Sequence, residues 1–305
     1  MAPHSLPTDP AEDAVRDERR PPGFFQRLAR GRTALLSLVF IIVITLAALV
    51  GPVLYGVDPT HTDFASNNAP PSMAHVLGTD RLGHDTLARL LAGLRVSLLV
   101  AAVVEMINIL VGAPLGLLAG YFGGWVDIVI SRLADMFFAF PGLLLAILVA
   151  AVFGQAVTEQ YGSTARLVLV AGSLSLVGWP LMARYVRGQV LSLRERDFVL
   201  AAQAVGQSKR GILRRHILPN VAGLVITAAT LDVVNAIVGE ATLSLLGLGI
   251  QAPATSIGKM IVEATPFLAQ NPLLVFVPSV ILTLLVLSFS FLGDGMRRAF
   301  DPTGR

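Results

Sequence analysis

Apolar residues run in long, uninterrupted stretches along most of the chain, and short polar segments separate them. Several of these stretches reach the roughly 20 residues that a helix needs to cross a bilayer. They are continuous rather than alternating, which favours membrane helices over the strands of a barrel. The pattern predicts six spans, at about residues 33–55, 96–120, 126–153, 167–184, 221–250 and 272–292. We therefore expect an all-α integral membrane protein with six transmembrane helices.

The polar segments divide the chain into regions. Residues 1–32 are rich in Pro and Arg and predict a disordered arm before the first span, 33–55. Residues 56–95 leave the membrane and carry an amphipathic helix that Asp85 can cap. Residues 96–293 form a five-helix core, which contains a polar loop at 197–220, and 294–305 form a tail. In the second span, glycines at every fourth position predict close helix packing, at Gly112, Gly116 and Gly120.

Composition supports a membrane protein and excludes several kinds of chemistry. Apolar residues make up 54% of the chain and charged residues 14%, against the roughly 25% charged residues of soluble domains. The chain has no cysteine, which excludes disulfides, thiolate catalysis and Cys-ligated metals. Its five histidines fall at no metal-ligand spacing, so we expect no metal site. The arginines of the arm flank a membrane span and indicate orientation rather than nucleic-acid binding.

The distribution of basic residues predicts which ends of the spans face the cytoplasm. With the N-terminus inside, the arm carries six, residues 184–215 eight and the tail three of the 23 Lys and Arg residues. Cytoplasmic loops hold such an excess of basic residues. The bias places residues 197–220 on the cytoplasmic side.

The loop at 197–220 reads DFVLAAQAVGQSKRGILRRHILPN and contains two short helical patterns. The first pattern places Phe198, Ala201, Ala202 and Val205 on one helix face. It ends at Gly206, which suits the residue after a helix end. Ser208 can cap the second pattern, and Pro219 is predicted to stop it. This arrangement can accept a side chain from a partner protein, while a solvated connection remains the alternative.

The same loop resembles the cytoplasmic loop of bacterial ABC importer permeases, which reads EAA, three residues, Gly, nine residues and I-x-L-P. Leu200 and His216 depart from that pattern. The segments GTDRLGHD, ATLSLLGLG and LGDGMRRAFDP are similar to the dipeptide, oligopeptide and nickel branch of the family, and to the C-type permease of its pair. The resemblance implies a type I ABC importer transmembrane domain. It also implies an ATPase-coupling loop made of Leu200, Ala201, Ala202, Gly206, Ser208, His216, Leu218 and Pro219.

The resemblance further implies an assembly in the bacterial cytoplasmic (inner) membrane, surrounded by lipid. Its members would be a paralogous permease that forms a heterodimer with this chain, two cytoplasmic ATP-binding subunits and an extracytoplasmic substrate-binding protein. The solute would be a dipeptide, an oligopeptide or a related small solute such as a nickel chelate. The chain has no G-x-x-x-x-G-K-[ST] run. We therefore expect a transport subunit without an ATPase site or cofactor, with ATP bound by the partner subunits.

Charged residues within the spans are the remaining candidates. Glu105, Asp232 and Glu240 are candidates for the translocation pathway or a subunit interface, because buried carboxylates in spans are costly. Arg132 and Asp135 stand at i, i+3 and are predicted to form a structural pair. An alternative function is an ion-coupled secondary transporter that uses the three carboxylates. The spans show no paired repeat, however, and that alternative leaves the polar loop unexplained.

Overall fold

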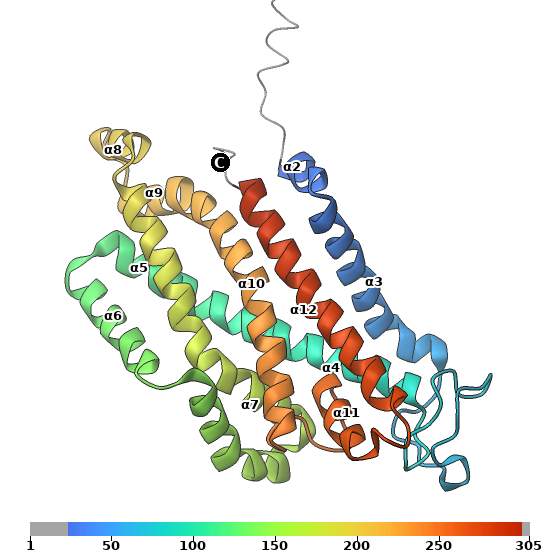
Figure 1. The fold of residues 1–305 in the computed structure, drawn as a ribbon. Coiled ribbons are helices and arrows are strands. Elements are labelled where there is room, and N and C mark those ends of the chain that lie inside the picture. The colour runs from blue at the N-terminus through green and yellow to red at the C-terminus, as the bar shows by residue number, and fades with distance from the viewer. Residues whose placement is uncertain (1–23, 301–305) are drawn as a thin grey trace, which may run out of the picture.

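The computed structural model describes residues 24–300, and this part of the chain is almost entirely helical (Figure 1). Two π-helical segments, η2 and η3, interrupt longer α-helices. The elements are α2 Phe24–Arg30, α3 Arg32–Tyr55, η1 Phe64–Ser66, α4 Thr86–Ile107, η2 Asn108–Gly112, α5 Ala113–Phe122, α6 Gly124–Phe138, α7 Gly142–Arg194, α8 Asp197–Ala204, α9 Lys209–Ile212, η3 Leu213–Ile217, α10 Leu218–Leu245, α11 Ile257–Ala264, η4 Thr265–Phe267 and α12 Leu273–Phe300.

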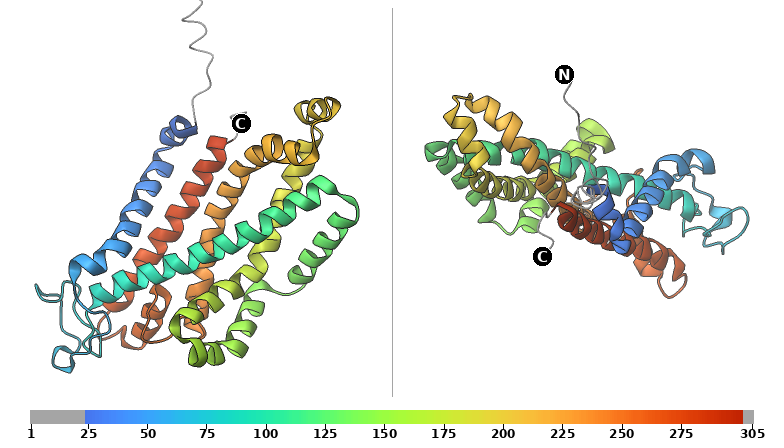
Figure 2. Two further views of the ribbon diagram at one scale, coloured as in Figure 1. Left: turned by 180° about the vertical axis from the view of Figure 1, so that it is seen from behind. Right: turned by 90° about the horizontal axis from the view of Figure 1, so that it is seen from above.

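Five helical segments within residues 24–300 are long and apolar enough to cross a membrane: Arg32–Tyr55, Thr86–Phe122, Gly142–Arg194, Lys209–Leu245 and Leu273–Phe300. The 53-residue segment α7 is interrupted at Gly162, where φ is +80° and ψ is −173°. The chain turns back there, so α7 supplies two antiparallel arms (Figures 1 and 2). With α6 leading into the first arm, the chain makes the six predicted passes.

The boundaries of the third and fourth passes differ from the prediction. The predicted span 126–153 is broken between α6 and α7, at residues 139–141. Pro141 has no backbone N–H and restricts Phe140 before it, so the helix cannot run through this point. The predicted connection at 154–166 is helical on both sides of Gly162, and the following helix continues to Arg194.

The second pass is one long helix of 37 residues, formed by α4, η2 and α5. At 1.5 Å per residue it is about 55 Å long, well beyond the roughly 30 Å of a bilayer core. It therefore runs obliquely across the other helices (Figures 1 and 2). Asp85 caps its start as predicted, because its carboxylate accepts the Ala88 N–H at 2.8 Å. The amphipathic helix expected in residues 56–95 is the first part of this long helix, not a separate element.

The ends of the elements gather on two opposite faces. On one face lie α2, the turn between α5 and α6, α8, α9 and the C-terminal end of α12 (Figure 1). On the other lie residues 56–85, the turn of α7 and α11. Within the predicted disordered arm, residues 24–30 instead form α2, whose Phe24 ring packs 4.3 Å from that of Phe300. The rest of the arm, 1–23, and the end of the tail, 301–305, lie outside the described residues.

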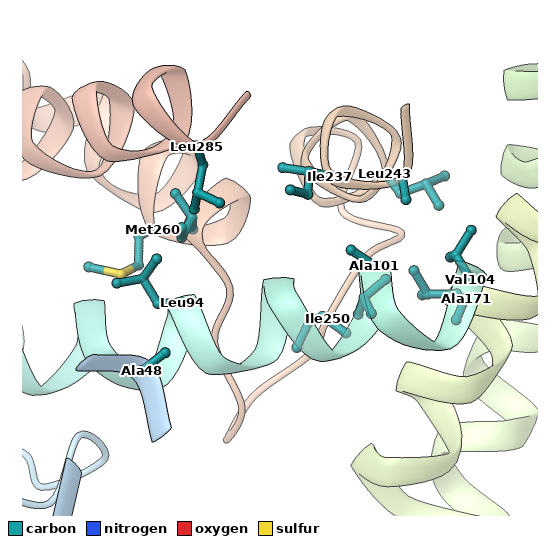
Figure 3. Packing of buried hydrophobic residues seen from close by; sticks show 14 of the residues in the cluster. Ala48, Leu94, Ala101, Val104, Ala171, Ile237, Leu243, Ile250, Met260 and Leu285 are labelled. Atoms are coloured by element: carbon teal, nitrogen blue, oxygen red, sulfur yellow. The ribbon is translucent and has the colours of Figure 1, made fainter. Parts of the chain in front are cut away.

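The core is organised around α4. Side chains from α3, α7, α10, α11 and α12 converge on it (Figure 3), and Leu94, Val100 and Ile237 are among the most deeply buried. The predicted close packing at the glycines of the second pass is confirmed. A Cβ added at Gly116 would lie 2.4 Å from the Ala183 carbonyl oxygen of α7, a distance too short for real contacts. Only glycine lets α5 and α7 approach so closely.

Candidate coupling loop and polar sites between the spans

The loop at 197–220 begins with α8, which ends in a Schellman turn. The Gln207 N–H donates to the Ala202 carbonyl at 3.0 Å, and the Gly206 N–H donates to the Gln203 carbonyl at 2.9 Å. Gly206 has φ +76°, which a residue with a Cβ adopts only at a cost. The predicted role of Gly206 just after the helix end is therefore confirmed as local structure.

The second half of the loop differs from its prediction at Pro219. Ser208 caps α9 as predicted, since its Oγ accepts the Gly211 N–H at 3.2 Å. The helix then continues through the π-helical η3 into α10 without a break. Pro219 does not stop a helix, because the helix continues on both sides of it, where η3 passes directly into α10. The loop is thus joined directly to a membrane-crossing helix.

Most of the exposed residues of α8 and its end are apolar, and the polar Asp197 and Gln203 are exposed beside them. Val199 and Ala202 face inward and are buried, so the inward face is shifted from the predicted one, in which Ala202 shared a face with Phe198 and Val205. The exposed fraction is 43% for Phe198 and 83% for Val205. Leu200, Ala201 and Ala204 are the other exposed apolar residues of this segment. Figure 1 shows α8 projecting from the body of the molecule, so these residues are accessible to a partner protein.

His216 and Leu218 complete the loop. His216 Nε2 lies 3.0 Å from Gln207 Oε1, and the Asn220 side-chain amide donates to the His216 carbonyl at 2.6 Å. These contacts link the turn after α8 to the start of α10. Leu218 is exposed. The departure from the family pattern at His216 therefore supplies a hydrogen bond within the loop, which the sequence alone did not indicate.

The structure separates the three candidate carboxylates of the spans into two sites. Asp232 accepts from the side-chain amides of Asn108 at 3.0 Å and Asn235 at 2.9 Å. Glu105 lies close enough to Asp232 to interact electrostatically, yet within residues 24–300 neither of its carboxyl oxygens has a hydrogen-bond partner. Glu240 belongs to neither of these contacts and lies in a separate network.

Glu240 is 1% exposed and is held by serines. Its carboxylate accepts from Ser97 Oγ at 3.2 Å and from Ser244 Oγ at 2.7 Å. Ser97 Oγ also accepts the Ile257 N–H at 3.2 Å, at the start of α11. The network joins α4, α10 and α11, which is the geometry of a buried residue that holds helices together.

The predicted pair between Arg132 and Asp135 is not formed. Asp135 instead pairs with Arg184 of α7, at 3.0 Å, and the Arg184 guanidinium lies 4.4 Å from the centre of the Phe138 ring. In the described part of the chain no ion pair joins Arg132 to Asp135. The i, i+3 spacing brings two side chains within reach, but α7 packs along α6 and offers a competing cation.

A polar network that the sequence did not predict lies on the face opposite α8. Asp80 pairs with Arg89, and Arg89 Nη2 also reaches Glu263 Oε2 of α11 at 2.5 Å. His84 Nδ1 lies 2.8 Å from Asp80 Oδ2. His84 therefore helps to hold the Asp80 carboxylate in place, a structural role that the sequence alone did not suggest. Burial raises the pKa of Asp80, but hydrogen bonds from His84 and Leu82 and the charge of Arg89 outweigh it, and its pKa lies below the ordinary value.

Comparison with known proteins identifies similar chains. Residues 112–305 match the family described as "Binding-protein-dependent transport system inner membrane component", and residues 23–71 match "N-terminal TM domain of oligopeptide transport permease C". A dipeptide transport system permease protein of Alkalihalophilus pseudofirmus is 36% identical over 300 residues, which are 98% of this chain and 94% of the relative. An oligopeptide transport system permease protein of Bacillus subtilis is 35% identical over 276 residues, which are 90% and 87% of the two chains.

A third relative and a solved structure extend the comparison. A glutathione transport system permease protein of Pectobacterium atrosepticum is 36% identical over 280 residues, which are 92% of this chain and 90% of the relative. The structure of an inward-facing MetNI methionine ABC transporter superposes with a TM-score of 0.55 at 20% identity. The match covers 70% of this chain and 96% of that one, and it shows a shared fold.

Proposed function

Because the chain belongs to the family of binding-protein-dependent transport system inner membrane components, and is thus the permease subunit of an ABC importer, we propose that it carries dipeptides or oligopeptides inward. It is a multi-pass protein of the inner membrane, and its family is not the ATPase of such importers. The similarity to dipeptide and oligopeptide permeases over most of the chain supports the choice of peptides. A nickel chelate or glutathione is the alternative solute.

In this proposal the loop at 197–220 couples the ATP-binding subunits to the membrane helices. The single observation that carries it is the group of exposed large apolar residues on α8 and its end, Phe198, Leu200 and Val205, which project beyond the membrane-crossing helices (Figure 1). Exposed apolar residues that gather outside the membrane mark a surface that a protein partner covers. Leu200, Ala201 and Val205 would pack in a groove of an ATP-binding subunit, and Ser208 and His216 would hold the turn behind them.

Movement of the loop reaches the membrane through α10. The helical path from Lys209 to Leu245 is continuous and connects one face of the molecule to the other. When the ATP-bound subunits close on each other, α8 moves with them, and α10 tilts as a rod. The spans then open outward to accept the solute, and ATP hydrolysis returns them to the inward-facing state.

The partners follow from the same family. We propose a heterodimer with a paralogous permease, two cytoplasmic subunits that bind ATP, and an extracytoplasmic binding protein. The absence of a G-x-x-x-x-G-K-[ST] run supports ATP binding by the partners alone. The excess of Lys and Arg near α8 and α9 supports a cytoplasmic location for that face and for the N-terminus.

Reconstitution tests this function. The permease pair and its ATP-binding subunits would be placed in proteoliposomes with the loaded binding protein, and uptake of radiolabelled trialanine would be followed. We expect uptake to require ATP inside and to stop when the P-loop lysine of the ATP-binding subunits is changed to alanine. Uptake by this chain alone, driven by a proton gradient, would instead establish the ion-coupled transporter.

A further inference from the structure

A cavity of about 340 Å³ lies between α4, α7 and α10. Apolar and glycine residues form most of its wall, and its polar groups are few. Asn108, Asp232 and Asn235 lie together, with Thr242 further along α10. Asn235 is exposed, so the cavity opens to the surface of this chain rather than being sealed inside it. Cavities of this size hold small organic groups.

The charge of Asp232 is not balanced by a protein cation. Its two donors, the side-chain amides of Asn108 and Asn235, are neutral. Within residues 24–300 no Lys, Arg or His forms an ion pair with it. Glu105, one helical turn before Asn108, adds a second carboxyl group behind the cavity wall. Carboxylates in membrane spans are normally paired or functional.

A buried hydrogen-bond acceptor without a partner lies in the cavity wall. Asn108 is fully buried and lines the cavity, and its Oδ1 has no partner among the described residues. The wall is shaped around this side chain, because a Cβ at Gly178 would come within 2.3 Å of the Asn108 amide nitrogen. The π-helical segment η2 begins at Asn108, and such segments recur at functional sites. The site thus offers acceptors and negative charge.

We propose that this cavity is a subsite for the ammonium terminus of the transported peptide, an inference that rests on the proposed function. An ammonium group brings a positive charge and three N–H donors, which suit the Asp232 carboxylate. The cavity is far larger than a bare ion requires. Across residues 24–300 no three His, Asp or Glu side chains come together as metal ligands would. The neutral amides that share Asp232 keep the contact weak enough for release.

The test compares two isosteric peptides in the reconstituted complex. Trialanine carries the ammonium, and lactyl-alanyl-alanine carries a hydroxyl in its place. Initial uptake rates would be measured with the binding protein saturated by each peptide, so that its own affinity does not enter. We expect Asp232→Asn to slow uptake of trialanine at least about tenfold, equivalent to about 1.4 kcal/mol. Uptake of the lactyl peptide should change less than about twofold.

Matched variants separate recognition from a general defect. Asp232→Glu keeps the charge and should retain the preference for trialanine. Asp135→Asn makes the same chemical change at the exposed ion pair with Arg184. It should lower the uptake of both peptides only slightly and to the same extent. If Asp232→Asn does not assemble, Asn235→Asp adds an acid at the cavity mouth, and the ratio of trialanine to lactyl peptide uptake should rise.

Three results would overturn the subsite. The first is an equal loss of uptake for both peptides in Asp232→Asn, and the second is an unchanged uptake ratio in Asn235→Asp. The third is that Asp232→Asn removes a dependence of uptake on external protons or sodium but leaves the selectivity for the amine unchanged. In each of these results the wild-type complex still imports peptides with ATP. Failure of the proposed function is distinct, because the wild-type complex would then import neither peptide even with ATP and loaded binding protein.

Discussion

At the scale of single residues, Gly206 shows how backbone conformation determines a loop. A Cβ at this position would meet nothing within 4 Å, so crowding does not exclude a side chain. The constraint is its φ of +76°, which costs about 1 kcal/mol or more for a residue other than glycine, and more for a β-branched one. Asparagine tolerates this conformation far better than valine does. Gly206 is therefore required for the direction of the chain between α8 and α9.

We predict that Gly206→Val leaves membrane insertion intact but redirects α8, so that the ATP-binding subunits no longer co-purify and ATP-driven uptake falls at least about tenfold. Gly206→Asn is the matched control and should keep both activities within about twofold. Membrane fractionation, affinity co-purification and uptake measure the three properties. Normal uptake by Gly206→Val would show that α8 is not the coupling element.

Asp80 allows a pH prediction at the same scale. Its pKa is lower in the folded protein than in the unfolded chain, where it is about 4. The ionised form therefore stabilises the fold fully above pH 4, and this stabilisation is lost as the pH falls through the folded-state pKa. We expect Asp80→Asn to lower stability by about 1–3 kcal/mol at pH 7, and this difference from wild type should shrink below pH 4.

Thermal unfolding of the detergent-purified protein between pH 7 and pH 3 measures this effect. Asp58→Asn serves as a comparison: Asp58 lies on the same face but is exposed, and its side chain bonds only to Thr60. These bonds also lower the pKa of Asp58, so we expect the same pH trend with a smaller effect than for Asp80→Asn. A difference between Asp80→Asn and wild type that stays constant from pH 7 to pH 3 would contradict the linkage.

At the scale of elements, the contact between α5 and α7 depends on glycines that replace side chains. A Cβ at Gly116 would clash with the backbone of Ala183, which cannot move without separating the helices. We predict that Gly116→Ala destabilises the protein by about 1–3 kcal/mol. Gly188→Ala, in the same helix pair, should be neutral or slightly stabilising, since nothing lies within 4 Å of its added Cβ.

Thermal unfolding of the two variants in one detergent checks this prediction. The comparison uses the same substitution twice, so that helix propensity cancels. Equal stabilities of Gly116→Ala and Gly188→Ala would show that α5 and α7 are free to repack.

Local signals in the sequence predicted the elements well, because their causes lie within a few residues. The caps at Asp85 and Ser208 and the helix end at Gly206 depend on neighbours in the chain. Pairings between elements were predicted poorly. The partner of Asp135 is Arg184, 49 residues away, and its position depends on how α7 packs against α6. Glu105 and Asp232 were singled out separately, but a single sequence could not place them side by side.

At the scale of the whole molecule, the long helices needed more than hydropathy. Six apolar stretches predicted six passes, but hydropathy could not reveal that α4, η2 and α5 form one oblique helix, or that α7 turns back at Gly162. The polar cavity lies between three elements far apart in sequence, so only the fold assembles it. The distribution of Lys and Arg residues predicts, in addition, that the face carrying α8 points into the cell.

That orientation can be tested directly, because the chain contains no cysteine and single cysteines can be introduced without removing others. Asn67 and Gln270 lie on exposed segments of the face that carries α11, and Glu195 lies between α7 and α8 on the opposite face. The Lys and Arg residues near α8 and α9 favour the cytoplasm for the second face. We expect an impermeant maleimide to label Asn67→Cys and Gln270→Cys in intact spheroplasts. Glu195→Cys should react only after the membrane is permeabilised, and the reverse pattern would place α8 outside the cell, where no ATP-binding subunit could reach it.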